Sequence, residues 1–371
     1  MAYITELFKQ NNIKNDRLFY LNTNSLLDIA SGEFLPGIYK KKHQFHLNGG
    51  LAPLNGIIGT EQTYKSSIGL SFLSRVLSIY KDSYGLCYDS EYAIPNEHRI
   101  ITLSDEIKYG HDIGNRLVLK DKSDYDMDQF FNLLKKMVLE REQHKKDLLV
   151  ETPFINPKTG KPYLTVIPLV VIIDSLSLMQ SAKELTMYNE HDISAKEQNM
   201  MFMMDGKAKS QFIKQLPLMA HKGGIHFILT AHITTKVSIN PFEKTKKELQ
   251  FMKFNDTTRG TGKQFSALMN TLLETRSVKV LQDSKKGAYY PLTKNSSNVD
   301  LSTVDTVTCR NKNNESGSIV PFISSQKYGI QSSLGNYHYL RDEPSLNLKG
   351  AKSKIPLKPD ITFNRKQIRK Q

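Results

Sequence analysis

The sequence predicts an α/β protein with a mostly parallel central sheet flanked by helices. Apolar runs rich in β-branched residues alternate along the 371 residues with segments of helical period, and this is the pattern of strands joined by crossover helices. A chain of this length can bury a large core, as one large α/β domain or as two. The strand candidates, each an apolar run, are 54–59 (LNGIIG), 84–89 (YGLCYD), 169–174 (LVVIID), 225–232 (IHFILTAH), 305–310 (DTVTCR) and 319–325 (IVPFISS).

The predicted helices follow from apolar side chains at helical spacing. Between the first two strands the recurring residues are Phe72, Leu73, Val76, Leu77 and Tyr80. A second helix near 126–146 buries Phe130, Phe131, Leu134, Met137 and Val138, and a third carries Phe212, Ile213, Leu216 and Met219. The stretch 156–163 (NPKTGKPY) is typical of a turn between short strands. Segments 186–204 and 234–264 lack clean periodicity, which predicts long loops, and such loops are usually either functional or disordered.

We expect three parts in the chain: an N-terminal oligomerisation segment (1–24), a core (25–340) with an insertion near 120–165, and a basic flexible tail (341–371). The stretch MAYITELFKQNN of the first segment either forms an amphipathic helix that docks on a neighbouring subunit, or folds its apolar residues back on the core of its own chain. The tail carries nine Lys and Arg against three Asp and Glu, a net charge of +6. It is either an auxiliary, salt-sensitive DNA contact or an inert solubilising tail.

The charge, the cysteines and the apolar runs of the chain indicate which classes of partner to expect. Lys and Arg number 51 and Asp and Glu 37, a net charge of +14 that favours a polyanionic partner such as nucleic acid, or that merely keeps the protein in solution. Cys87 and Cys309 make neither a disulfide framework nor a metal cluster, which fits a reduced, cytoplasmic setting. The apolar run 167–173 is too short to span a bilayer. We therefore expect no membrane partner.

Residues 59–66 (GTEQTYKS) match a phosphate-binding loop except at one position. Gly59, Lys65 and Ser66 stand at the spacing of G-x-x-x-x-G-K-[ST], between a predicted strand and a predicted helix, and Tyr64 replaces the second glycine. Such a loop needs backbone N–H groups around the phosphates, a lysine on the β and γ phosphates and a hydroxyl on Mg²⁺. The helix N-terminus adds a favourable dipole. An accidental loop is the alternative.

Polar residues follow the other apolar strands, where ligands of open parallel sheets gather. Asp174 ends one strand and is a candidate for positioning Mg²⁺, or for capping a helix. Asp89 and Glu91 end another, where a carboxylate can orient the water that attacks the γ phosphate. His232 ends a third and is placed to sense that phosphate. Strand ends are commonly polar, so the prediction depends on the whole set.

Together these blocks resemble the RecA-like recombinases, and within them the bacteriophage UvsX-like branch. That branch has an aromatic residue at the second glycine of the P-loop, as Tyr64 is here, and carries YDSE after the second core strand, as residues 88–91 do. His232 matches its phosphate-sensing position. The segments LLDIASGEF and GGLAPLNGIIG look like the strands that lead into its core, and TTRGTGKQFSALMNTLLETRSVKV resembles its second DNA-binding loop with the following helix and strand.

The resemblance implies a RecA-type P-loop ATPase core and a role for each matching residue. ATP would be bound by residues of one continuous loop, namely Gly59, Thr60, Glu61, Gln62, Thr63, Tyr64, Lys65, Ser66 and Ser67. Ser66 and Asp174 would hold Mg²⁺, Lys65, Glu91 and His232 would be catalytic, and Arg310 and Lys312 would reach the ATP of a neighbouring subunit. The family's base-stacking aromatic falls near His98, where this chain has no tyrosine and an ordinary surface histidine is the alternative.

For DNA, the resemblance implies one contact loop within 186–204 and a second within 238–263. The residues themselves support the second loop, because basic side chains and glycine amides can grip phosphates there. The candidates are Arg259, Gly260, Thr261, Gly262 and Lys263. Phe251 and Phe254 either insert between bases or anchor the loop.

The expected function is that of an ATP- and Mg²⁺-dependent DNA recombinase. It would form a helical filament on single-stranded DNA, exchange strands with homologous double-stranded DNA, and work with a loading mediator and a single-strand-binding protein, in the host cytoplasm if its source is viral. A ring motor, such as a helicase or packaging ATPase, uses the same phosphate groups. A non-hydrolysing DNA-binding mediator, with Tyr64 as the lesion, is the rival outside the enzymes.

Overall fold

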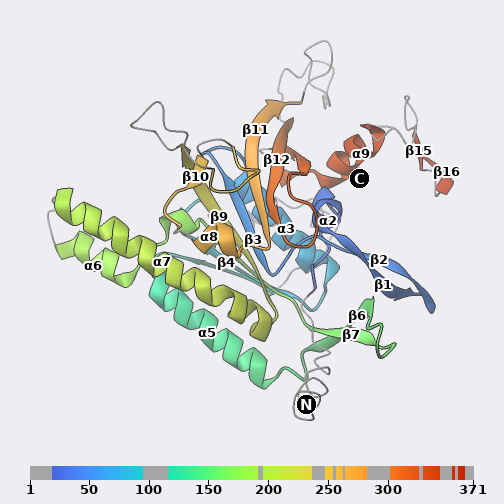
Figure 1. Ribbon diagram of the computed structural model, residues 1–371, viewed down its shortest axis with the longest axis horizontal. Helices are drawn as coiled ribbons and strands as arrows, with labels where there is room; N and C mark the ends of the chain where they lie inside the picture. The colour runs from blue at the N-terminus through green and yellow to red at the C-terminus, as the bar shows by residue number, and fades with distance from the viewer. Residues whose placement is uncertain are drawn as a thin grey trace, which may run out of the picture.

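A ten-stranded mixed sheet forms the centre of the computed structural model (Figure 1). The structure describes residues 19–94, 116–190, 195–235, 247–253, 256–261, 264–281, 301–325, 329–342, 353–355 and 358–363. In spatial order the strands are β14 (Gly329–Ile330), β13 (Ile319–Ser325), β12 (Leu301–Asn311), β11 (Thr271–Val280), β3 (Leu54–Gly59), β9 (Ile225–Thr235), β8 (Leu169–Asp174), β4 (Tyr84–Asp89) and β5 (Leu117–Asp121), with β10 (Asp256–Thr258) paired to β9.

The prediction of a mostly parallel sheet is wrong. Strands β11, β3, β9, β8, β4 and β5 pair in parallel, whereas β12, β13, β14 and β10 pair with their neighbours in the antiparallel sense. The short segment 312–318 between β12 and β13 explains part of the difference, because so few residues can join antiparallel strands but cannot make a parallel crossover. A sheet so divided does not identify the RecA-type core that the resemblance implied.

All six apolar runs predicted as strands are strands. The bounds of β3, β4, β8 and β13 coincide with the predicted ones, and β9 and β12 extend beyond theirs. In β3, β4 and β8 nearly every residue is buried, as expected for strands covered on both faces.

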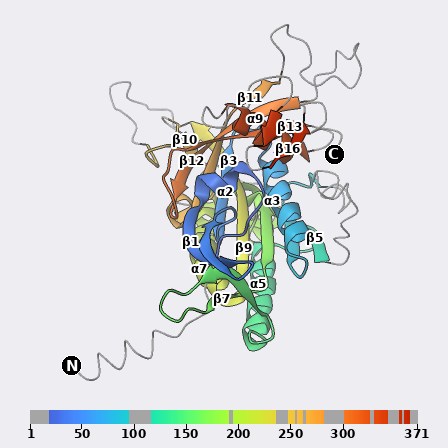
Figure 2. The same cartoon turned by 90° about the vertical axis from the view of Figure 1, so that its right-hand side faces the viewer.

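Helices cover the two faces of the sheet (Figure 2). They are α2 (Leu26–Ser31), α3 (Lys65–Ile79), α5 (Met127–Gln143), α6 (Ala182–Glu190), α7 (Ala195–Gly223), α8 (Gln264–Leu268) and α9 (Ser332–Asp342), with a 3-10 turn η4 (Leu176–Leu178). Neighbouring strand residues point to opposite cores: Ile58 packs with residues of α5 and α7, and Ile57 with residues of α2 and α3. None of the helices within the described residues is long and apolar enough to cross a membrane.

A second, four-stranded sheet lies beside the large one (Figure 1). It is antiparallel, in the order β2 (Lys42–Asn48), β1 (Glu33–Tyr39), β6 (Leu149–Ile155) and β7 (Pro162–Val166). The predicted turn at 156–163 joins β6 and β7. The block LLDIASGEF, expected to be a strand, is mostly the helix α2, which Ser25 caps through its side chain.

Two predicted irregular segments have a different outcome. Residues 186–204 lie largely in α6 and α7, apart from 191–194, which are outside the described part. Within 234–264, residues 236–246, 254–255 and 262–263 also lie outside it, while β10 and residues 247–253 are described. Within the predicted tail, β15 (Ser353–Ile355) and β16 (Lys358–Phe363) form a small antiparallel pair.

Candidate nucleotide-binding site

The predicted phosphate-binding loop is a turn between β3 and α3. Gly59 ends β3, and a Cβ added there would lie 1.8 Å from Thr275 Oγ1, so no larger residue fits. Thr63 donates its hydroxyl to the Thr60 carbonyl at 2.8 Å and accepts one from Thr275 at 2.7 Å. The turn is therefore braced from within and from the neighbouring strand β11.

The N-terminus of α3 is open to an anion. This helix of 15 residues has no side-chain cap and no acidic residue in its first turn, so its first N–H groups lack partners from a capping side chain. Unsatisfied N–H groups together with the helix dipole form a general binding site for phosphate. The arrangement is the one that the sequence pattern predicts.

Tyr64 occupies the glycine position by adopting a glycine-like backbone. Its φ is 61° and its ψ 21°, in the left-handed region, which costs a residue with a Cβ about 1–2 kcal/mol. Gln62 has φ 58° in the same turn. The Tyr64 side chain packs against the core that contains α3, and this packing offsets part of the strain. The loop thus keeps its shape without the second glycine.

Lys65 points into the turn that precedes it. Its Nζ donates to the Thr60 carbonyl at 2.6 Å, and the residue is 7% exposed. Burial lowers the pKa of the Lys65 ammonium, while the nearby Glu91, Asp174 and Glu61 carboxylates oppose that shift. A cation held this way lies at the centre of the loop, where phosphate oxygens would compete for it with the carbonyl.

Asp174 lies fully buried at the end of β8. Its Oδ1 accepts the Thr230 hydroxyl at 2.5 Å, and Ser66 makes a side-chain hydrogen bond to the same carboxyl group. Burial raises the pKa of Asp174, and the two hydroxyls act against it. Its Oδ2 is buried without a hydrogen-bond partner.

Ser66 and Asp174 fit the binding of Mg²⁺. A magnesium ion is usually held by one or two carboxylates together with substrate phosphates and water, and Asp174 Oδ2 and the Ser66 hydroxyl supply such donors next to the phosphate loop. Among the described residues there is no cluster of three or more His, Cys, Asp or Glu side chains that could hold a metal. A cage built only from the protein is therefore not found there, but Mg²⁺ with a nucleotide does not need one.

Glu91 and His232 lie in contact. The distance between Glu91 Oε1 and His232 Nε2 is 3.0 Å, and both side chains are partly exposed, at 27% and 19%. The hydrogen bond from His232 is the main reason that the pKa of Glu91 is lowered. The other ring nitrogen, Nδ1, is buried without a partner. Glu91 is therefore an ionised carboxylate held beside Lys65 and Asp174.

Asp89 has a different role from the one considered for it. Its carboxylate accepts the backbone N–H groups of Glu91 at 2.9 Å and Ile94 at 2.6 Å. Burial raises its pKa, and these hydrogen bonds oppose the shift. Asp89 thus shapes the turn that presents Glu91, and its oxygens are used within the protein.

Ser177 joins the nucleotide side of the sheet to the predicted DNA segment. Its hydroxyl accepts the His232 N–H at 3.0 Å and donates to the Arg259 carbonyl at 2.8 Å. Its own carbonyl accepts Lys209 Nζ at 3.1 Å. Arg259 N also donates to the His232 carbonyl at 2.8 Å. Four hydrogen bonds therefore meet within η4 and the end of β9.

The predicted second DNA loop is placed in part. Arg259 and Gly260 are exposed and Thr261 is buried, while Gly262 and Lys263 lie outside the described residues, as do His98 and Phe254. Phe251 packs its ring against Gly317, where an added Cβ would lie 2.7 Å from the ring. Its carbonyl accepts from Arg276. These contacts favour anchoring over insertion between bases for this residue.

Glu274, which the sequence reasoning missed, holds the base of that loop. The side chain is fully buried and accepts Arg276 at 2.8 Å, the Cys309 thiol at 3.2 Å and the Lys253 N–H at 3.3 Å. Burial and the Glu274 carboxylate raise the pKa of Cys309, so this thiol stays protonated. An acidic residue directly after the apolar pair Leu272 and Leu273 of β11 was the available signal.

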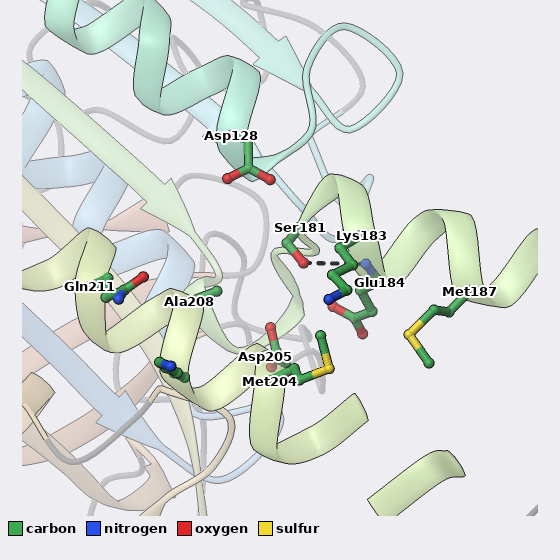
Figure 3. Close-up of a pocket in the computed structure, with 10 residues that line it drawn as sticks. Asp128, Ser181, Lys183, Glu184, Met187, Met204, Asp205, Ala208 and Gln211 are labelled. Carbon is green, nitrogen blue, oxygen red and sulfur yellow. Dashed lines mark hydrogen bonds between the residues drawn. The ribbon is translucent and has the colours of Figure 1, made fainter. Parts of the chain in front are cut away.

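The region of the predicted first DNA loop has little positive charge. A cavity of about 270 Å³ lies between the start of α5, α6 and α7 (Figure 3). Its charged lining residues are Asp128, Glu184, Asp205, Lys183 and Lys207, and Lys209 is paired with Asp205 at 2.9 Å. Burial raises the pKa of both Glu184 and Asp205. The lining therefore has no excess of positive charge that would favour a phosphate contact.

Arg310 and Lys312 lie at the other edge of the sheet. Arg310 Nε donates to the Met269 carbonyl at 3.1 Å and Lys312 Nζ to the Leu268 carbonyl at 3.2 Å, at the C-terminus of α8, where cations are favoured. Arg310 pairs with Leu272 near the start of β11, while Gly59 pairs with Thr275 further along. Neither basic side chain joins the phosphate loop of its own chain.

No known protein-family model matches the chain, and no curated protein matches it.

Proposed function

We propose that the protein is an ATP-dependent DNA recombinase that forms filaments on single-stranded DNA and exchanges strands with homologous duplex. The observation that carries this proposal is the meeting of Lys65, the Ser66–Asp174 pair and the Glu91–His232 pair at one edge of the parallel strands. The motif resemblance to the UvsX-like branch of the RecA-like recombinases supplies the choice of DNA as the polymer. The net charge of +14 agrees with it.

In this proposal each side chain has one task in hydrolysis. Lys65 leaves the Thr60 carbonyl and binds the β and γ phosphate oxygens, where α3 directs its open N–H groups. Ser66 and Asp174 would hold Mg²⁺, which would supply positive charge beside those oxygens. Glu91 accepts the proton of the attacking water, the water oxygen bonds to the γ phosphorus, and the bond to the β-phosphate oxygen breaks to release ADP.

His232 and Ser177 would couple that step to DNA. When Glu91 turns toward the water, its hydrogen bond to His232 is lost, and His232 becomes free to contact the γ phosphate. The backbone of His232 is bonded to Ser177 and Arg259, so a shift of β9 reaches the predicted DNA segment. Arg310 and Lys312 would complete the site of a neighbouring subunit. Work in the cytoplasm, that of the host if the source is viral, with a loading mediator and a single-strand-binding protein belongs to the same proposal.

A titration of ATPase activity with single-stranded DNA tests the proposal. We expect single-stranded DNA to stimulate hydrolysis, Lys65→Ala to abolish it, and Glu91→Gln to lose at least a hundredfold in turnover while keeping ATP binding, because a general base is worth about 10²–10⁴-fold. Lys81→Ala, an exposed lysine just beyond α3, is the matched control and should be unchanged.

Three outcomes separate the rivals. ATPase that does not respond to DNA and survives Lys65→Ala contradicts the proposal. ATP binding without turnover in the unmodified chain would favour the non-hydrolysing mediator. Electron microscopy with single-stranded DNA and a nonhydrolysable ATP analogue shows open filaments in our proposal and closed rings for a helicase or packaging motor.

A further inference from the structure

The β1–β2 hairpin carries exposed aromatic rings and a basic turn that the proposed nucleotide chemistry does not use. Phe34 and Phe45 are each 70% exposed, and Tyr39 is 52% exposed. Lys40, Lys41 and Lys42 are exposed at the turn. Residues 33–48 contain these three lysines, two histidines and one acidic residue, Glu33 at the start of β1.

The two phenylalanines share one face of the hairpin. Phe34 pairs with Leu47 and Phe45 with Pro36, so the two rings are diagonal neighbours, about 7–8 Å apart at the backbone. On the side of β1 away from β2, the neighbour is β6, joined at Gly37 and Phe154. The acidic residue of β6 is Glu151, and it leaves the charge of the hairpin positive.

The turn keeps lysines where the backbone disfavours them. Tyr39 pairs with Lys42, so Lys40 and Lys41 form a two-residue loop, and their φ angles are 48° and 63°. Two-residue hairpin loops with both φ angles positive strongly favour Asn-Gly. Lysine has neither the freedom of glycine nor the short hydrogen-bonding side chain of asparagine. Lys40 and Lys41 therefore place positive charge at a turn whose backbone conformation favours other residue types.

We propose that the β1–β2 hairpin binds single-stranded nucleic acid, with Phe34 and Phe45 stacking on bases and the turn residues Lys40 and Lys41 on phosphates. Aromatic faces beside cations are the general means by which proteins hold single strands. A duplex keeps its bases stacked inside, whereas a single strand offers them to the rings. Lys40 and Lys41 lie at the tip of the hairpin, and Phe34 and Phe45 lie further from the tip, in the strands. A hairpin that inserts into a membrane needs an apolar tip, whereas this tip is charged.

This site is distinct from the ATP site and is tested without it. Binding of a labelled oligothymidylate is measured by fluorescence anisotropy over a salt series, without nucleotide, in the Lys65→Ala background. The double variant Lys40→Asn/Lys41→Gly removes two charges and gives the turn its preferred residues, so the hairpin stays folded. We expect the slope of log K against log salt to become shallower by about 1.4, because each single-strand phosphate contact contributes about 0.7.

The ring contribution is tested by Phe45→Leu and Phe34→Leu, which keep an apolar side chain without the aromatic face. Each should lower the affinity about tenfold, as stacking on one base is worth. The control Lys136→Gln/Lys146→Gln removes the same charge from exposed positions of α5 and the turn after it. It should leave the affinity for the single strand nearly unchanged.

Several results would overturn the inference. An unchanged salt slope in Lys40→Asn/Lys41→Gly, with a melting temperature at least as high as before, removes the phosphate contact. Binding of phosphatidylserine vesicles that falls in these variants while oligothymidylate binding does not would assign the surface to a membrane. A dimer in sedimentation that dissociates on Phe45→Leu would assign it to a second copy of the chain. By contrast, ATPase that ignores DNA and survives Lys65→Ala would contradict the proposed function, and this inference would still stand if oligothymidylate binding falls in the hairpin variants.

Discussion

At the scale of single residues, the candidate site depends on buried polar atoms whose partners are incomplete. Asp174 Oδ2 and His232 Nδ1 are both buried without a hydrogen bond within the described part of the chain. A buried polar atom without a partner costs about 1–3 kcal/mol, and such costs are usually kept where a ligand is bound. The same residues that fit Mg²⁺ and phosphate should therefore weaken the free protein.

Asp174→Asn tests whether the Asp174 carboxylate lowers the stability of the free protein while it is needed to bind Mg²⁺ and nucleotide. Because burial raises the folded-state pKa of Asp174 above its unfolded value, the ionised form destabilises the protein above that pKa, and the penalty disappears as the pH falls toward the unfolded value. We expect Asp174→Asn to raise the free energy of unfolding at neutral pH by about 1 kcal/mol, with the gain shrinking in acid, and to abolish Mg²⁺-dependent ATP binding. Denaturant melts at several pH values and a nucleotide titration measure both.

Asp89→Asn is the matched control for that substitution. Burial also raises the pKa of Asp89, but its carboxylate accepts N–H groups from Glu91 and Ile94. The two N–H groups bond to different carboxylate oxygens, and an asparagine has only one oxygen that can accept. Asp89→Asn should therefore lose stability. A stability loss in Asp174→Asn as large as that in Asp89→Asn would contradict the assignment of Asp174 as a ligand-ready group.

The sequence predicted some of these residues and missed others for a physical reason. Lys65, Ser66 and Asp174 follow from a local motif and from the ends of apolar strands. Thr275 and Thr230, which brace the loop and the carboxylate, are far from their partners in sequence, Thr275 being 212 residues from Thr63. Only the pairing of β11 with β3 and of β9 with β8 brings them there, and hydroxyls in strands carry no signal of such contacts.

At the scale of elements, η4 and the end of β9 connect the two predicted halves of the function. Ser177 accepts from His232 and donates to Arg259, so the short turn after Asp174 is tied both to the phosphate side and to the segment before Gly260. The Ser177 hydroxyl is used in both of these contacts within the protein. Ser177 is therefore a positioning residue.

Ser177→Ala should uncouple the two halves. The variant loses two hydrogen bonds of about 1 kcal/mol each, and we expect DNA-stimulated turnover to fall about tenfold, while the affinity for ATP and the basal ATPase stay within twofold. Ser177→Thr keeps the hydroxyl and should restore most of the stimulation. Turnover and the DNA concentration for half stimulation are measured separately, since a purely structural defect would lower ATP affinity as well.

The sequence also predicted elements unequally. The buried strands β3, β4 and β8 were found because their residues, apart from Asn55 and the terminal Asp89 and Asp174, are apolar or glycine. Helix α3 was found because its apolar face has a helical period. The hairpin β1–β2 was missed, because both its faces hold exposed side chains and the alternation that marks a half-buried strand is absent. The division of the large sheet into parallel and antiparallel parts depends on connections that the apolar pattern does not report.

At the scale of the whole molecule, Arg310 and Lys312 lie at the sheet edge opposite the phosphate loop. Their strand β12 runs antiparallel to β11, so its end is at the beginning of β11, while Gly59 and Lys65 are at the other end of the parallel strands. If these cations complete an ATP site, as proposed, they must do so in another subunit. Such a head-to-tail contact generates an open filament unless the rotation closes into a ring.

Mixing two inactive variants tests this arrangement. Lys65→Ala retains the cations but has no competent loop, and Arg310→Ala/Lys312→Ala retains the loop but has no cations. Each alone should be inactive in DNA-stimulated hydrolysis. In an equal mixture a competent loop meets intact cations at about a quarter of head-to-tail contacts, so roughly a quarter of the normal activity should return. If Arg310 and Lys312 contact the phosphate loop of their own chain, or no phosphate loop, mixing the two variants restores no activity. Full activity in Arg310→Ala/Lys312→Ala alone would show that these side chains only cap the C-terminus of α8, as the hydrogen bonds to Met269 and Leu268 already allow.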